Sequence, residues 1–234
     1  METKTNQTLR IKEEKPKLTV DHKGKDLTFV HPSYGPDTYA NVGSEIEREG
    51  LIRPTMSEIT SLFHSAFNSD NKYSKEIQKL MKDRYLWGCT GTLYVPNKGA
   101  YIQDDPEVRN GMPFMEESEL VRKLESSDPS VRFVPFGFQT EEMTSLQLST
   151  NPYVKALVGD EGAEKLAEIA DKHRNKPYLW SFRFVDKPLI RVSTLDSYWD
   201  LGGWLDVVGN GRGGNMGGCS FGVSRTGEAS RLKK

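Results

Sequence analysis

The order of hydrophobic patterns along the chain constrains its fold more than any other feature of the sequence. Apolar residues alternate with polar ones, as strands require, near both ends of the chain, at 18–30 and from 178 onward. Between these regions most apolar residues recur every three or four positions, which is typical of helices that cover a sheet. We therefore expect an α+β fold, with a mainly antiparallel sheet built from both chain ends and helices between them.

Local signals predict individual elements. A Gly-containing turn separates two short strands at 18–20 and 27–30, and the prolines and glycines of 31–43 predict a loop. The best-defined helix begins at Thr55, whose side chain can form a capping box with Glu58. The remaining expected elements are strands at 85–95, 100–102, 178–185 and 189–192 and helices at 74–84, 116–125, 152–158 and 161–173, the last two as an antiparallel pair.

The length of the chain indicates one domain. At 234 residues, roughly 70% of the unfolded surface can be buried in a single core. Residues 1–17 are polar and charged, and we expect them to be a flexible N-terminal segment. Residues 18–234 then form a single α+β domain with a helical insertion at about 115–174.

The charge balance argues against two classes of partner. Lys and Arg number 32 against 33 Asp and Glu, so the net charge of -1 gives no positive field for a phosphate backbone, and we expect no nucleic acid partner. No apolar run approaches the roughly 20 residues that span a bilayer, so we expect no membrane partner. Because the N-terminal residues carry no export signal, we expect a cytoplasmic protein, unless a leader was removed.

The cysteines and histidines do not have the spacing of a metal site. Cys89 and Cys219 lie 130 positions apart and the four histidines are scattered, so we expect no metal. Two reduced, buried thiols are the favoured interpretation, because free cysteine behaves as a small hydrophobic residue. A disulfide between the two is the alternative, which only an oxidising compartment would sustain.

The glycines near the C-terminus resemble a nucleotide-binding loop only superficially. Gly209, Gly211 and Gly214 match the pattern G-x-G-x-x-G after an apolar strand. That motif needs a helix directly after the glycines to face the pyrophosphate, and residues 215–218 are a poor helix start. We therefore expect no dinucleotide cofactor, and indeed no cofactor. A connection between two strands, with its backbone close to aromatic rings, is the favoured interpretation.

The same C-terminal region combines large rings with polar side chains. Rings supply apolar area and polar groups fix orientation, which suits a sugar or another small polar ligand, or else a protein partner. An ordinary loop, whose polar side chains satisfy its turns, is the alternative. The candidate ligand-binding residues are Trp199, Asp200, Trp204, Asp206, Asn210 and Arg212.

Function is therefore expected to be that of a binding or interaction module, and two alternatives stay open. The first is a cytoplasmic enzyme that uses Cys89 as nucleophile with His64 as base, or the acids near Asp200. The second is a structural subunit of a homo-oligomer, in which the exposed rings meet a second copy. No assembled catalytic set in the sequence decides between them.

Two short segments resemble a known family. Ile52-Arg53-Pro54-Thr55-Met56-Ser57-Glu58 and Cys219-Ser220-Phe221-Gly222-Val223-Ser224-Arg225 are similar to the helix start and the closing segment of the C-type-lectin-like fold in the formylglycine-generating-enzyme and Lcl-type domain group. The match departs from that pattern at 52–53, where the apolar residue and the arginine are exchanged, at Ile59, where tryptophan is usual, and at Ser224, which displaces the arginine. The resemblance implies a scaffold whose irregular loops present a binding surface. The paired cysteines of the oxidising enzymes are not reproduced, so their catalytic role is not carried over.

Overall fold

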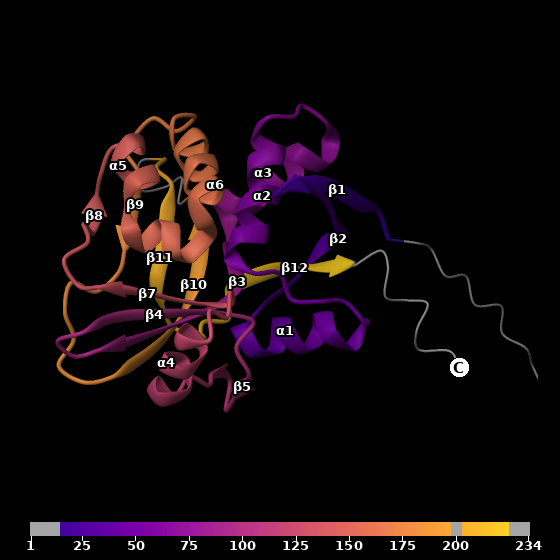
Figure 1. Cartoon of the computed structure of the whole chain (residues 1–234). Coiled ribbons are helices and arrows are strands. Elements are labelled where there is room, and N and C mark those ends of the chain that lie inside the picture. The colour runs from indigo at the N-terminus through magenta and orange to yellow at the C-terminus, as the bar shows by residue number, and fades with distance from the viewer. Residues whose placement is uncertain (1–14, 198–202, 225–234) are drawn as a thin grey trace, which may run out of the picture.

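The computed structural model describes residues 15–197 and 203–224, and its centre is a large, mainly antiparallel sheet (Figure 1). The expected α+β fold is confirmed. The strands of the sheet are β1 (Lys17–His22), β2 (Lys25–Asp37), β3 (Tyr85–Val95), β4 (Gly99–Asp104), β7 (Val131–Pro135), β8 (Glu141–Glu142), β9 (Tyr178–Trp180), β10 (Leu189–Asp196), β11 (Asp206–Gly211) and β12 (Gly218–Ser224). A separate short hairpin consists of β5 (Val108–Arg109) and β6 (Met112–Pro113). The helices are α1 (Tyr39–Arg48), α2 (Met56–Phe67), α3 (Lys72–Asp83), α4 (Glu117–Glu125), α5 (Ser145–Thr150) and α6 (Pro152–Ala170).

The strand order brings the two ends of the chain together. The main path through the sheet is β1-β2-β12-β3-β10-β11-β9-β8, and β4 and β7 branch from β3. The late strand β12 is therefore inserted between β2 and β3. Two neighbouring pairs, β12 with β3 and β11 with β9, are parallel, whereas the other pairs of the sheet are antiparallel.

The N-terminal hairpin forms where the sequence predicts it, but the segment after it is not a loop. β1 and β2 pair across a two-residue turn whose residues, Lys23 and Gly24, both have positive φ. β2 continues to Asp37, and α1 follows at once, where a loop over 31–43 was expected. Thr38 caps α1 through a hydrogen bond from the Asn41 amide. The prediction of a loop was wrong because the prolines of β2 sit in a strand whose pairing with β12 is interrupted by register shifts, and such shifts tolerate proline.

The predicted helices are present with altered boundaries. Thr55 and Glu58 form the expected capping box at the start of α2. α3 begins at Lys72 rather than at residue 74, because the Asn71 side chain accepts the hydrogen bond from the Ser74 amide. α6 consists of two helical segments that meet at Gly159, whose φ of +81° and ψ of 169° are not helical, so the predicted end of the first helix at this glycine is confirmed. The region 115–174 holds α4, α5 and α6 but also two strands, β7, which pairs with β4, and β8, which pairs with β9.

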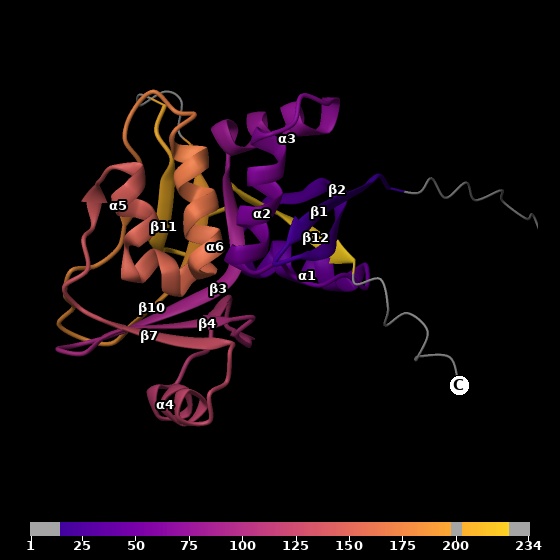
Figure 2. The ribbon, with the colours of Figure 1, turned by 45° about the horizontal axis from the view of Figure 1, so that its top comes forward.

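Helices cover both faces of the sheet (Figure 2). The main core lies between the sheet and α2, α3, α5 and α6, with Phe63, Tyr153 and Phe221 fully buried in it. On the opposite face, α1 packs against Trp87 and Cys89 of β3. α4 covers a third, smaller core over β4 and β7. None of the helices within residues 15–197 and 203–224 has the length and apolar character needed to cross a membrane.

The capping box of α2 gives a first stability prediction. We expect Thr55→Ala to lower the free energy of unfolding by about 1 kcal/mol, because the Glu58 amide loses its acceptor. For a chain of this size the melting temperature should fall by about 3 °C, which differential scanning calorimetry measures. Thr55→Ser, which keeps a capping hydroxyl, is the control. Equal melting temperatures for the alanine variant and the parent would contradict the prediction.

Candidate functional site

Two buried carboxyl groups meet on one face of the sheet. Asp196 of β10 and Asp206 of β11 are direct partners in the antiparallel register, so their side chains lie on the same face. Burial, followed by the neighbouring charge of Asp206 and a hydrogen bond to it, raises the pKa of Asp196 to about 8. Asp196 therefore keeps its proton at neutral pH and donates it to Asp206. The two acids together carry one negative charge rather than two.

Both indoles of this region are held by the same carboxylate oxygen. Trp180 Nε1 and Trp204 Nε1 each donate a hydrogen bond of 2.8 Å to Asp206 Oδ1. Burial raises the pKa of Asp206, while the hydrogen bonds from Trp180, Asp196 and Trp204 oppose this rise. Asp206 thus fixes the directions of two aromatic rings that come from different parts of the chain.

The ring of Tyr178 extends this arrangement. Tyr178 and Trp180 lie on the same face of β9, with ring centroids 4.3 Å apart and planes tilted by 34°. Trp180 is 42% exposed, whereas Asp206 is buried beneath it. We call Tyr178, Trp180, Asp196, Trp204 and Asp206 the tryptophan–carboxyl surface.

The opposite face of these strands explains why Asp196 and Asp206 point away from the main core. Alternate residues Leu179, Leu195 and Val207 have no exposed area and face the main core. Gly209 continues that face against the ring of Tyr153. Because the side-chain period of a strand is two, fixing these apolar residues inward forces Asp196 and Asp206 to the other face.

The structure brings together some of the residues that the sequence selected and separates others. Trp204 and Asp206 join in the tryptophan–carboxyl surface, whereas Asn210 lies farther along β11, where the pairing with β10 shifts register. Arg212 is exposed in the turn after β11, about 20 Å from Asp206 at the usual rise of a strand. That turn packs against α1, where the Tyr39 amide donates to the Gly213 carbonyl at 3.0 Å. Trp199 and Asp200 lie outside the described residues.

Sequence reasoning missed three members of the surface. Tyr178, Trp180 and Asp196 stand in segments that were predicted to be strands or lie next to one, but nothing local shows that β9 pairs with β11. The available signal was the two-residue spacing of the aromatic residues Tyr178 and Trp180, which puts both rings on one face of a strand.

The Gly-rich segment connects β11 to β12, as expected. A Cβ atom on Gly217 would lie within 3.0 Å of the Tyr85 hydroxyl, and one on Gly218 would overlap the Trp87 indole. These glycines therefore let the backbone approach aromatic rings. β12 begins at Gly218, so a strand follows the glycines where a dinucleotide-binding loop requires a helix.

The cysteines are free and buried, as the favoured interpretation expected. Burial raises the pKa of Cys89 to about 12, and the thiol donates to Asp105 at 3.4 Å and lies 3.3 Å from the Tyr39 hydroxyl. His64 instead makes its hydrogen bond to Glu168, at 2.6 Å. Cys89 and His64 therefore have separate hydrogen-bond partners. A thiol with the pKa of Cys89 stays protonated at neutral pH.

Across residues 15–197 and 203–224, no cluster of three or more His, Cys, Asp or Glu side chains is placed to hold a metal ion.

Comparison with protein-family models, curated proteins and solved structures gave no match. The two segments that carry the resemblance to C-type-lectin-like domains lie side by side, through mutual backbone hydrogen bonds of 3.0 and 2.9 Å between Ile52 and Val223. Arg225 lies outside the described residues.

Proposed function

We propose that this protein is a binding module that holds a sugar, neutral or amino-substituted, on the tryptophan–carboxyl surface. The observation that carries the proposal is the pair of hydrogen bonds by which Trp180 and Trp204 share Asp206 Oδ1. An exposed indole whose orientation is fixed before binding loses little conformational freedom when a ligand packs against it.

The chemistry of the surface selects the class of ligand. Sugar rings present apolar C–H faces that pack on aromatic rings, while their hydroxyl groups bond to nearby polar side chains. The single negative charge of the acid pair disfavours anionic ligands and is compatible with neutral or cationic ones. Neutral and amino sugars satisfy both conditions.

Replacing the exposed indole should remove binding. In titrations with neutral, amino and acidic oligosaccharides followed by calorimetry, we expect Trp180→Ala to weaken binding of the best neutral or amino sugar by at least about tenfold. This loss corresponds to about 1.4 kcal/mol of binding free energy. The reason is the removal of the exposed stacking face that Asp206 holds in place.

Phe184 supplies the matched control. It follows β9 by four residues and is 72% exposed. We expect Phe184→Ala to bind the sugar as the parent does. Unchanged affinity in Trp180→Ala, or strongest binding to acidic oligosaccharides, would contradict the proposal.

A second candidate function is hydrolysis of the bound ligand by the acid pair. It is favoured by the pKa of Asp196 of about 8, because a carboxyl group that keeps its proton at neutral pH can serve as a general acid. Mass spectrometry of oligosaccharides after incubation with the protein distinguishes the two functions. Cleavage that is lost in Asp196→Asn supports the enzyme, whereas intact oligosaccharides with retained binding support the binding module.

A further inference from the structure

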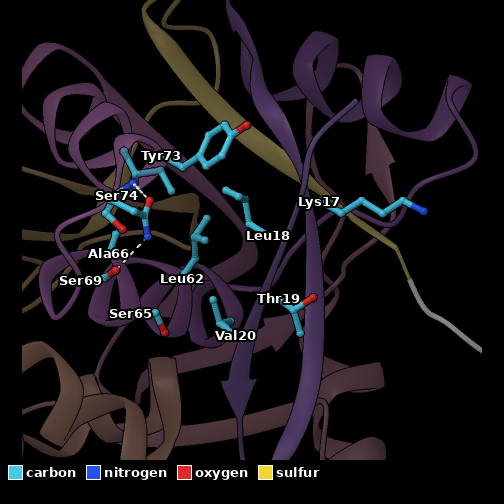
Figure 3. Close-up of a pocket in the computed structure, with 12 residues that line it drawn as sticks. Lys17, Leu18, Thr19, Val20, Leu62, Ser65, Ala66, Ser69, Tyr73 and Ser74 are labelled. Carbon is cyan, nitrogen blue, oxygen red and sulfur yellow. Dashed lines mark hydrogen bonds between the residues drawn. The ribbon is translucent and has the colours of Figure 1, made fainter. Parts of the chain in front are cut away.

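A groove lies between the terminal strand β1 and the helices α2 and α3, away from the tryptophan–carboxyl surface (Figure 3). Its volume is about 270 Å³. Small hydroxyl and amide side chains of α2, α3 and the turn between them form its rim. Its floor is apolar and consists of Leu18, Val20, Leu62, Ala66 and Ile77.

One wall of the groove is main chain rather than side chain. All four residues from Lys17 to Val20 line it, although consecutive side chains of a strand point to opposite faces. Leu18 and Val20 point toward the helices, whereas Lys17 and Thr19 point away from them (Figure 3). At Lys17 and Thr19 the groove is therefore lined by backbone.

The register of the β1–β2 hairpin shows which backbone groups of β1 bond to β2 and which point away from it. His22 and Lys25 flank the two-residue turn, and the His31 amide donates to the Pro16 carbonyl at 2.9 Å. The even-numbered residues of β1 thus bond to β2. Among the residues that the structure describes, no strand pairs with the other side of β1, so the amide and carbonyl groups of Lys17 and Thr19 lie at a free edge of the sheet.

A side chain of α6 marks the end of this free edge. Lys165 Nζ donates to the Asp21 carbonyl at 3.5 Å, as the outward direction of the odd-numbered residues requires. Lys165 also bonds to Ser61 of α2, at 3.1 Å. The open edge is therefore short and runs along the groove from Lys17 to Val20.

We propose that an extended peptide segment of another protein adds a strand to β1 at this edge. In antiparallel pairing, a residue opposite Lys17 exchanges both main-chain hydrogen bonds with it, and the next residue enters the groove beside Leu18. Lys17 is the one charged residue among the twelve described residues that line the groove, so an acidic residue opposite it is complementary. The favoured peptide alternates acidic and apolar residues, with the apolar side chains on the floor of the groove.

The position of the peptide's own amides provides a decisive test on the unmodified protein. The probe is a fluorescein-labelled octapeptide with glutamate and valine in alternation, measured by fluorescence anisotropy. In the bound register the glutamate amides face β1 and the valine amides face solvent. N-methylation of the glutamates should therefore abolish binding, whereas N-methylation of the valines should leave the affinity within about threefold. Equal effects of the two modifications, or no saturable binding of the unmodified probe, would overturn the proposal.

Two variants of the protein test the same geometry. Thr19→Pro removes an outward amide and leaves the ladder to β2, so the affinity for the probe should fall at least about tenfold. Thr19→Val is its control, because both variants lose the 3.0 Å hydrogen bond between the Thr19 and Thr28 hydroxyls. Lys17→Glu should lower the affinity for the glutamate peptide and raise the affinity for a peptide in which lysine replaces glutamate. Unchanged affinities in Thr19→Pro and Lys17→Glu would exclude pairing at this edge.

Discussion

At pH 8, an Asp196→Asn variant should unfold at a higher temperature than the parent protein, whereas at pH 4 the two should unfold together. The pKa of Asp196 is about 8 in the folded chain, against about 3.9 for an unperturbed aspartate. Between these values the folded state keeps a proton that the unfolded state has released. The free energy of unfolding therefore decreases as the pH rises through this window and levels off above pH 8.

The size of this effect follows from the same linkage. Each unit of pKa difference corresponds to roughly 1.4 kcal/mol. Asparagine cannot ionise, keeps the shape of the protonated acid and still donates to Asp206. Allowing for the coupling between the two acids, we expect a gain of about 3 kcal/mol at pH 8, or a rise in melting temperature on the order of 10 °C.

Calorimetric melting curves from pH 4 to pH 9 measure this prediction. The pH dependence of the parent should be steeper than that of Asp196→Asn between pH 4 and about pH 8, and the two curves should run parallel above it. Asp186→Asn, at an exposed position, is the control for loss of a carboxyl charge and should follow the parent curve. A constant difference between Asp196→Asn and the parent at all pH values would show that Asp196 does not hold a proton in the folded state.

Gly209→Ala should be the most destabilising single substitution in the Gly-rich segment. A Cβ atom at Gly209 would lie within 3.0 Å of three atoms of the Tyr153 side chain, its hydroxyl oxygen among them. Tyr153 cannot give way, because it has no exposed area and its hydroxyl lies 3.0 Å from that of Tyr94 and 3.1 Å from that of Thr92. We expect a loss of about 3 kcal/mol and a melting temperature lower by about 9 °C.

Gly214 is the matched control on the same segment. No atom lies within 4 Å of a Cβ placed there. Gly214→Ala should leave the stability unchanged or raise it slightly, since alanine restricts the unfolded chain. A melting temperature for Gly209→Ala close to that of Gly214→Ala would show that β11 does not pack on α6 as described.

The sequence predicted the features that depend on near neighbours. The capping box of Thr55, the β1–β2 hairpin and the close approach of the Gly-rich segment to aromatic rings all follow from residues a few positions apart or from glycine itself. α1 also had such a signal, with a capping Thr38 before Tyr39, Val42 and Ile46 at helical spacing. The nearby prolines led instead to the prediction of a loop, although they belong to the preceding strand β2.

The candidate site could be predicted only in part, because it depends on distant pairing. Trp204 and Asp206 were selected from their own segment, but Trp180 reaches Asp206 only through the parallel pairing of β9 with β11. Asp196 meets Asp206 through a register that a shift of one residue would abolish. The pattern of a single strand contains neither its partner nor its register.

The position of β12 determines when this protein can fold during synthesis. Residues 218–224 are synthesised after every other strand of the sheet, yet they pair with both β2 and β3. In a nascent chain that ends before β12, the edges of β2 and β3 that face β12 have no partner strand, so other unfinished polypeptides can pair with them. A premature stop codon before residue 218 should therefore yield insoluble fragments rather than a smaller working protein, and chaperones that shield strands are expected to hold the growing chain until β12 has been synthesised.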